Sequence, residues 1–292
     1  MPNLPYYPTV VVSDIHLGTS HSKTYEVSEF LRSIRCDLLI MNGDIIDGWH
    51  LKKSGMGKWK KKHTKFFKTI MKMMEKYNTK IVYIRGNHDD FLDNLMPLQF
   101  ANIEVVTEWT YENFGKRYYV CHGDVFDSIT TKMKWLAQLG DTGYTFLLWV
   151  NKVYNQNRLK RGLPYYSLSQ KIKNKVKGAI NYITDFESEI VSLAKHKQCD
   201  GVICGHIHHP DNKMCGDVHY LNSGDWVESL SALIQDELGE WQVVYYDGML
   251  KEQIKEEAST LAEQLDLQNN APPAPTHSMS ETRTAELDES PL

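Results

Sequence analysis

The first strand-like run of the chain is Thr9-Val10-Val11-Val12, and it leads directly into Ser13-Asp14-Ile15-His16, which carries two metal-binding side chains. Four later runs, at residues 38–41, 81–84, 118–121 and 202–204, end in the same way. They precede Gly43-Asp44, Gly86-Asn87-His88-Asp89, His122-Gly123-Asp124 and Gly205-His206-Ile207-His208. A strand fixes the position of the residue that follows it, so several strands of one sheet bring such residues to one edge. The sequence therefore predicts a metal centre.

The candidate ligands are carboxylates, imidazoles and one amide, a mixture that suits two divalent ions such as Mn²⁺, Fe²⁺ or Zn²⁺. Two ions about 3.5–4 Å apart need a shared anionic ligand, and Asp44 lies between the early and the late ligands. We assign one ion to Asp14, His16, Asp44 and His208, and the other to Asp44, Asn87, His122 and His206. Such a pair would lower the pKa of a shared water and neutralise phosphoryl oxygens in the transition state.

His88 follows the candidate ligand Asn87 directly, so its imidazole is expected at the rim of the centre. There it would protonate or hydrogen-bond the leaving oxygen, with Asp89 or Asp124 orienting the ring. The predicted catalytic residues are therefore His88, Asp44 and Asn87.

The five motifs, taken in this order, resemble those of the calcineurin-like metallophosphoesterase superfamily over roughly residues 9–250. The resemblance implies an α/β fold, a four-layer αββα sandwich. It also implies a dinuclear metal centre and the hydrolysis of phosphoester bonds, carried by the eight residues of the motifs: Asp14, His16, Asp44, Asn87, His88, His122, His206 and His208.

Within the superfamily, the chain is most similar to the UDP-2,3-diacylglucosamine hydrolases of lipid A synthesis. The similar segments are Ser13-Asp14-Ile15-His16-Leu17, Asn87-His88-Asp89-Asp90-Phe91 and Gly224-Asp225-Trp226. This similarity implies a Mn²⁺ pyrophosphatase that releases UMP and a lipid 1-phosphate at the inner membrane. The chain departs from the best-known members, which carry Arg at the position of His88 and an acidic pair where only Asp127 lies close.

The 292 residues, 41% of them hydrophobic, are enough to bury one large core with an insertion. We expect a catalytic domain over residues 1–252, with a helical cap at about 125–192, a lysine-rich loop at about 50–65 and a disordered acidic tail over 258–292. Helical patterns at 25–34 and 65–77 alternate with the strand-like runs, and bunched runs at 220–221, 229–234 and 241–246 predict a second sheet facing the first.

Eleven lysines and a single acidic residue, Glu75, lie between Leu51 and Lys80. This run is either a solvated helix face or a surface that attracts an anionic partner, phospholipid or nucleic acid. In the expected cap, ten basic residues accompany five acidic ones and many aromatics, a composition suited to acyl chains and phosphates. Asp127, Lys171 and Lys175 are its candidate substrate contacts.

No apolar stretch approaches roughly 18 residues, and the N-terminus lacks the pattern of a signal peptide. The five cysteines form no close pair, which is typical of reduced thiols. We therefore expect a cytoplasmic enzyme, and the similarity to the UDP-2,3-diacylglucosamine hydrolases implies that it is peripheral to the inner membrane. Two alternatives stay open, a phosphodiesterase or nuclease acting on nucleic acid or another soluble phosphodiester, and a non-catalytic scaffold on the same fold. The sequence does not indicate the oligomeric state.

Overall fold

The computed structural model describes residues 4–126, 152–163 and 177–247 of the chain. Most of the expected cap and the whole of the expected tail lie outside these residues, so both remain predictions. Asp127, Lys171 and Lys175 also lie outside them. Among the described residues, no helix is both long enough and apolar enough to cross a membrane.

The first sheet has seven strands in the order β12-β11-β1-β2-β3-β5-β4. Neighbours from β1 to β5 run parallel, while β11, β12 and β4 add antiparallel strands at the two sides. The bounds are β1 Tyr6–Val12, β2 Arg35–Asn42, β3 Lys80–Ile84, β4 Leu98–Phe100, β5 Ile103–Val106, β11 Ser231–Gln235 and β12 Trp241–Tyr245.

The second sheet has five strands in the order β6-β7-β8-β10-β9. The strands β7, β8 and β10 run parallel at its middle, and antiparallel β6 and β9 flank them. The bounds are β6 Glu108–Asn113, β7 Lys116–Cys121, β8 Gly201–Cys204, β9 Asp211–Cys215 and β10 Val218–Asn222.

Two expectations are wrong: that the ligand-bearing strands share one sheet, and that the three late strand-like runs all belong to the second sheet. The strands that lead into the candidate ligands lie in both sheets, β1, β2 and β3 in the first and β7 and β8 in the second. Of the three late runs, only β10 joins the second sheet. The other two, β11 and β12, extend the first sheet, and β11 pairs with β1 across more than two hundred residues. Every residue of β11 is buried, which requires cover on both faces and a neighbour on each side.

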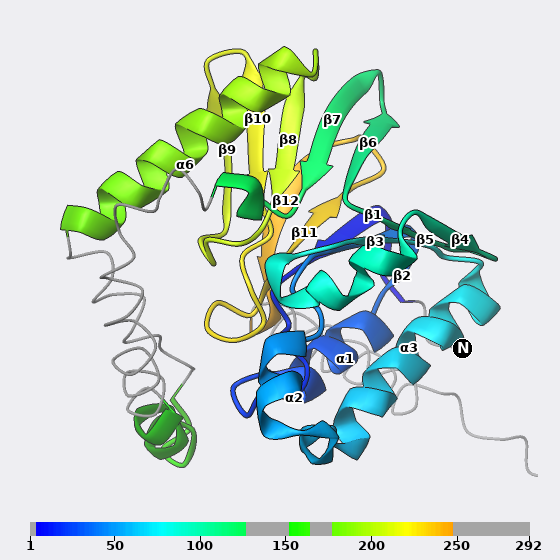
Figure 1. The fold of residues 1–292 in the computed structure, drawn as a ribbon, viewed down its shortest axis with the longest axis vertical. Coiled ribbons are helices and arrows are strands. Elements are labelled where there is room, and N and C mark those ends of the chain that lie inside the picture. The colour runs from blue at the N-terminus through cyan, green and yellow to red at the C-terminus, as the bar shows by residue number, and fades with distance from the viewer. Residues whose placement is uncertain (1–3, 127–151, 164–176, 248–292) are drawn as a thin grey trace, which may run out of the picture. The chain divides into compact units, whose positions relative to one another are not determined.

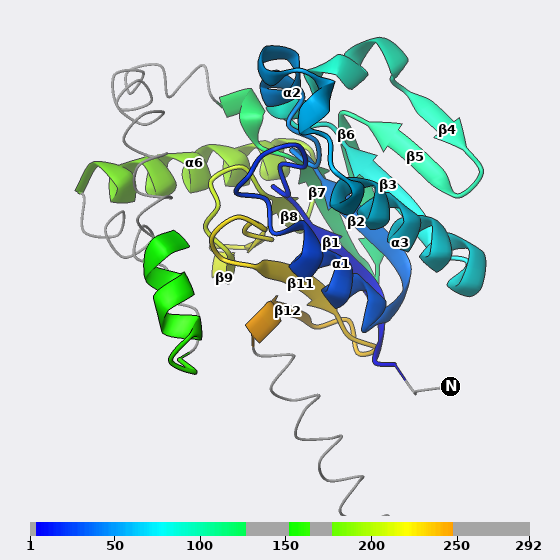
Figure 2. The same ribbon diagram turned by 90° about the horizontal axis from the view of Figure 1, so that it is seen from below.

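The core explains the layering, because alternate residues of a strand face opposite sides of its sheet. In β1, Val11 packs with Ile40, Val120 and Ile203 in the layer between the two sheets. Its neighbours Val10 and Val12 pack instead against the helices α1 (Thr24–Arg32) and α3 (Lys61–Tyr77) on the outer face of the first sheet. Helix α6 (Lys177–His196) covers the outer face of the second sheet, as Figures 1 and 2 show. The predicted α/β sandwich is confirmed.

The lysine-rich segment expected as a loop is helical over most of its length, in α2 (Gly48–Ser54), a 3₁₀ turn η1 (Met56–Lys58) and the start of α3. Asp47 caps α2 by accepting a hydrogen bond from the His50 amide at 2.7 Å. In α3, Phe66, Ile70 and Met73 recur at helical spacing and are buried. Lysine is itself a good helix former, so a run of lysines on one face does not favour a loop.

Candidate metal centre

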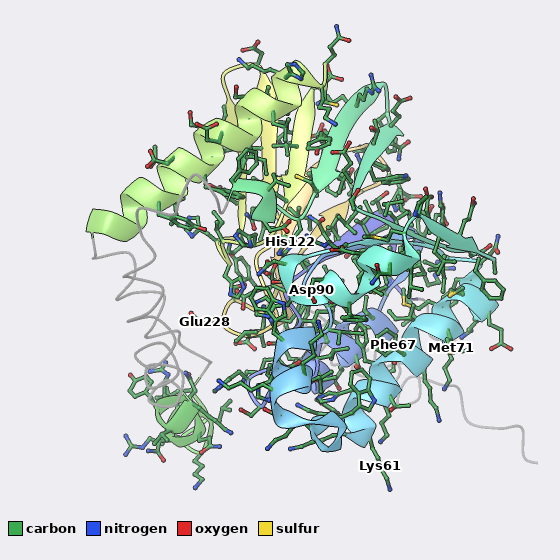
Figure 3. All side chains as sticks on the ribbon, viewed as in Figure 1. Lys61, Phe67, Met71, Asp90, His122 and Glu228 are labelled. Carbon is green, nitrogen blue, oxygen red and sulfur yellow. The ribbon has the colours of Figure 1, made fainter. Side chains whose placement is uncertain are left out.

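The candidate ligands lie in loops at the carboxyl ends of β1, β2, β3, β7 and β8, where the two sheets come together. Six of the seven fall into groups whose donor atoms lie within 4.8 Å of one another. One group is Asp14, His16 and His208, a second is Asp44, His122 and His206, and a third is His16, Asp44 and His88. Residues nearly two hundred positions apart in sequence thus meet at one place, and Figure 3 labels one of them, His122.

Asp44 lies between the groups. Its Oδ2 atom is 3.8 Å from His16 Nε2 and 3.3 Å from His122 Nε2, so one oxygen faces an imidazole from each side. Its Oδ1 atom accepts a hydrogen bond from the His88 amide at 2.8 Å. Burial opposes ionisation, but the His122 and His16 imidazoles hold the pKa of Asp44 well below its usual range.

Asp14 joins the first motif to the last. Its Oδ1 atom is 3.1 Å from His208 Nε2, and its Oδ2 atom accepts a hydrogen bond from the His206 amide at 3.1 Å. Burial alone would raise the pKa of this carboxyl, but His208 and His122 outweigh it and lower the pKa. The two imidazoles therefore favour the ionised form of the carboxyl.

His122 is almost fully buried, and each of its ring nitrogens faces a specific oxygen atom. Nδ1 donates a hydrogen bond to the Asn42 carbonyl at 2.9 Å, which points Nε2 at the centre. Although burial lowers the pKa of this imidazole, the Asp44 and Asp14 carboxylates raise it to about 10. The Asn42 side-chain amide donates to the Cys121 carbonyl at 3.1 Å and so ties the end of β2 to the end of β7.

Backbone strain is concentrated at the candidate ligands. Five of them have left-handed backbone with φ between 50° and 65°, a region that side-chain-bearing residues seldom adopt, namely Asp14, His16, Asp44, His206 and His208. Each such residue costs of order 1–3 kcal/mol, and strain of this kind collects at functional sites. Gly43 is constrained as well, because its φ is +80° and a Cβ there would lie 2.3 Å from His122 Nδ1.

His88 lies beside the groups, as predicted, but its orienting partner is Asp47. The His88 Nδ1 atom is 3.2 Å from Asp47 Oδ1, and the second Asp47 oxygen is 3.5 Å from His16 Nδ1. Burial lowers the pKa of His88, but the carboxylates of Asp47 and Asp44 more than compensate and raise it. Sequence reasoning missed Asp47, although its place three residues after Asp44 and directly before a helix was a usable signal.

The two carboxylates expected to orient the imidazole are engaged elsewhere. Asp89 accepts hydrogen bonds from the amides of Ile45 and Ile46 and from the Tyr83 hydroxyl, all at 2.9–3.1 Å. Asp124 accepts from Arg85 Nη1 at 2.6 Å. Both positions therefore shape the loops of the centre without contacting the His88 ring.

Arg85 joins the loop that carries Asn87 to the loop that carries His122. Its guanidinium also binds the Asp93 carboxylate in a bidentate manner. Nε donates to Asp93 Oδ1 at 2.8 Å and Nη2 donates to Asp93 Oδ2 at 3.2 Å. The two loops follow strands of different sheets, so this ion-pair network fixes them relative to each other. Nothing in the local sequence indicated it.

The loop that contains Gly224-Asp225-Trp226 contacts the backbone of the first candidate ligand, Asp14. The Trp226 amide donates to the Asp14 carbonyl at 3.1 Å, while the Trp226 ring is fully buried against Phe30. Asp225 accepts from the Val227 amide at 2.7 Å and so closes its own turn. The segment therefore holds the first ligand loop in place.

The donor set fits divalent cations. The Asn87 Oδ1 atom is buried and makes no hydrogen bond, which is costly for a polar atom. The buried Asp14 Oδ1 and His122 Nε2 atoms make no hydrogen bond of good geometry either, although each lies near an oppositely charged group, His208 Nε2 at 3.1 Å and Asp44 Oδ2 at 3.3 Å. A cation would satisfy all three, and imidazole with carboxylate and amide oxygen suits Mn²⁺, Fe²⁺ or Zn²⁺.

The sequence of the chain matches the model of the calcineurin-like phosphoesterases over residues 7–210. The chain belongs to this family. It is a metallophosphoesterase, a metal-dependent hydrolase of phosphoester bonds.

Solved structures similar to this metallophosphoesterase include Yfce, a phosphoesterase from E. coli, at 16% identity and a TM-score of 0.42, covering 82% of this chain and 93% of that one. A novel archaeal phosphodiesterase has 14% identity and a TM-score of 0.38, with coverage of 81% and 98%. Zn²⁺-bound Vps29 from Entamoeba histolytica has 10% identity and a TM-score of 0.38, with coverage of 82% and 98%. No curated protein matches the chain in sequence.

Proposed function

We propose that the metallophosphoesterase holds two divalent ions, Mn²⁺ by preference, and uses them to hydrolyse a phosphoester or pyrophosphate bond. Asp14, His16, Asp44 and His208 would hold one ion, and Asp44, Asn87, His122 and His206 the other. The observation that carries the proposal is the Asp44 Oδ2 atom, which faces His16 at 3.8 Å and His122 at 3.3 Å and is thus placed to be shared.

The bound ions would supply Lewis acidity toward the phosphoryl oxygens and toward the attacking water. The chain itself supplies the proton for the leaving oxygen. His88 is the group placed for this step, because the Asp47 carboxylate holds its Nδ1 atom at 3.2 Å and directs Nε2 away from that contact. As the P–O bond to the leaving group breaks, the proton on the imidazole passes to the departing oxygen.

The substrate we propose is UDP-2,3-diacylglucosamine, in which water would cleave the pyrophosphate to give UMP and a lipid 1-phosphate. The motif resemblance supports this choice, and so does a basic surface suited to anionic headgroups. The exposed lysines of α3 include Lys61, Lys65, Lys68 and Lys72. They support a cytoplasmic enzyme lying at the inner membrane surface.

A second candidate is a phosphodiesterase that acts on nucleic acid or on another soluble phosphodiester. The same lysines favour it, because a row of exposed cations also attracts a phosphate backbone. Substrate binding would then weaken steeply with salt. The absence of DNA and RNA binding at low ionic strength would exclude this candidate.

The test is hydrolysis of UDP-2,3-diacylglucosamine with Mn²⁺, with products identified by mass, beside bis(p-nitrophenyl) phosphate as a generic diester. Release of UMP and lipid phosphate supports the first substrate, and turnover of the generic diester alone leaves the metal centre but rejects that substrate. If neither is hydrolysed and metal analysis finds no bound Mn²⁺, Fe²⁺ or Zn²⁺, the chain is a non-catalytic scaffold.

A further inference from the structure

Trp49 is a large aromatic side chain left exposed beside the centre. It lies in the first turn of α2, and 47% of its surface is accessible to solvent. One side of its indole ring packs on the His88 imidazole, with ring centroids 4.4 Å apart and planes inclined by 36°. The His16 ring lies 4.7 Å from the same imidazole, with the two planes at 85°. His88 thus contacts both a candidate metal ligand and an exposed tryptophan.

The plane of the indole is held in place by its polar edge. Trp49 Nε1 donates a hydrogen bond to Asp90 Oδ2 at 3.0 Å, and Lys52 Nζ lies 3.4 Å from Asp90 Oδ1. The helix that carries Trp49 is itself fixed against the next loop, since a Cβ on Gly48 would lie 2.7 Å from the Phe91 ring. A rigid aromatic surface loses little entropy on binding and is therefore an efficient contact for a ligand.

The charge around Trp49 favours a neutral ring over a further anionic group. Lys52, three residues further along α2, is paired with Asp90, so it offers little to a phosphate at this position. Phe91, 37% exposed, adds a second apolar side chain from the adjoining 3₁₀ segment η2 (Asn87–Leu95). The rim next to His88 is aromatic, while the exposed lysines begin further along α2 and α3.

We infer that Trp49 forms a subsite on which a ring of the substrate, the flat face of a nucleobase or the C–H face of a pyranose, packs beside the group that protonates the leaving oxygen. The inference rests on the proposed function of the centre and adds the class of group that borders the scissile bond. A ring attached near the leaving oxygen meets the indole as that oxygen approaches His88. Stacking of this kind selects substrates with a ring over substrates with a short alkyl group.

The test compares phenylphosphonate with methylphosphonate, which differ only in the ring, by calorimetric binding to the full chain loaded with Mn²⁺. The ring should tighten binding in the native protein, and Trp49→Ala should reduce the phenyl-to-methyl preference about fivefold to tenfold. Trp49→Phe should keep most of that preference. Phe100→Ala removes a 74% exposed aromatic from the edge strand β4 and should leave it unchanged.

Equal weakening of both phosphonates in Trp49→Ala would overturn the inference, since Trp49 would then only position His88. An unchanged preference would overturn it too. If the native protein hydrolyses neither substrate but still prefers the phenyl ligand in a way that depends on Trp49, the proposed function is rejected and the subsite is kept. UMP, glucose 1-phosphate and glycerol 3-phosphate distinguish the two sources of the ring, because the one that loses most affinity in Trp49→Ala occupies the subsite.

Discussion

The metal centre and the rim beside it are built in opposite ways. Asp14, Asp44 and His122 are at most 3% exposed, and they stand at the ends of strands from two sheets. Trp49 and Phe91 are 47% and 37% exposed and stand on two short helical segments next to each other. Groups that must hold charge in a fixed geometry are buried on rigid elements, while groups that meet a variable substrate stay at the surface.

The difference also lies in how each region is held. In the centre, five of the candidate ligands have strained backbone and His122 is held by a buried hydrogen bond, so the loss of one ligand is expected to disturb its neighbours. At the rim, each side chain depends on one or two contacts of its own. Changes in the centre should therefore abolish the chemistry, and changes at the rim should alter selectivity or binding.

The largest effect is expected from Asp44→Ala, because this substitution removes the ligand proposed for both ions. We predict that kcat/KM with Mn²⁺ falls by at least about a thousandfold, equivalent to about 4 kcal/mol. His122→Ala should have a similar effect. Phe100→Ala is the matched control, and circular dichroism verifies that each variant folds. Activity of Asp44→Ala within tenfold of the native protein would contradict the two-ion proposal.

Arg85→Met should have the next largest effect. It removes the ion pairs to Asp93 and Asp124 that join the loops of the two sheets. We predict a loss of about tenfold to a hundredfold in Mn²⁺ affinity, measured by calorimetry, as is usual for groups that orient metal ligands. Arg117→Met is the control, because Arg117 is paired with Glu112 on the surface of the second sheet. Equal affinities in the two variants would show that Arg85 does not position the centre.

Metal binding should depend on pH through His122. The pKa of this imidazole is raised to about 10 without metal, so at pH 7 it carries a proton that the ion must displace. The Kd for Mn²⁺ should therefore fall as pH rises toward 10, by up to about tenfold per pH unit. Calorimetry in two buffers of different ionisation enthalpy measures the released proton, and a Kd independent of pH would contradict the expectation.

The same shift has a consequence for the stability of the metal-free protein. Protonated His122 stabilises the folded state fully below the ordinary pKa of 6.5, and this contribution is lost as pH rises through about 10. The free energy of unfolding without metal should therefore decline over this range, as denaturant titrations at several pH values would detect.

The smallest effect is expected from Lys68→Ala on the exposed face of α3. Activity on a small soluble diester should be unchanged. Binding to vesicles of anionic phospholipid should weaken by about 1 kcal/mol, roughly fivefold, and the loss should shrink at high salt. Lys116→Ala, an exposed lysine of the second sheet, is the control. Vesicle binding that both variants leave intact would argue against a membrane role for the lysine face.

Several features of the molecule follow from local sequence. Each ligand motif directly follows an apolar, β-branched run, so the strand and the ligand at its end are readable together, and β1, β2, β3, β7 and β8 are where the pattern predicts them. Ligand chemistry is also local, since carboxylate and imidazole bind divalent ions in any fold. No ligand motif follows β4, β5 or β6, so the same combination of strand and ligand does not mark them, and β4 is exposed throughout.

The tertiary structure alone decided how the strands divide into two sheets, and with that which side chains surround the ligands. Pairing of β11 with β1 depends on burial between residues more than two hundred positions apart, which no local pattern encodes. Asp47, Trp49 and Arg85 gain their roles in the same way, because each acts on a residue brought near by folding. Local sequence is enough to identify the atoms that could bind the metals, whereas packing decides which neighbours hold, orient and border them.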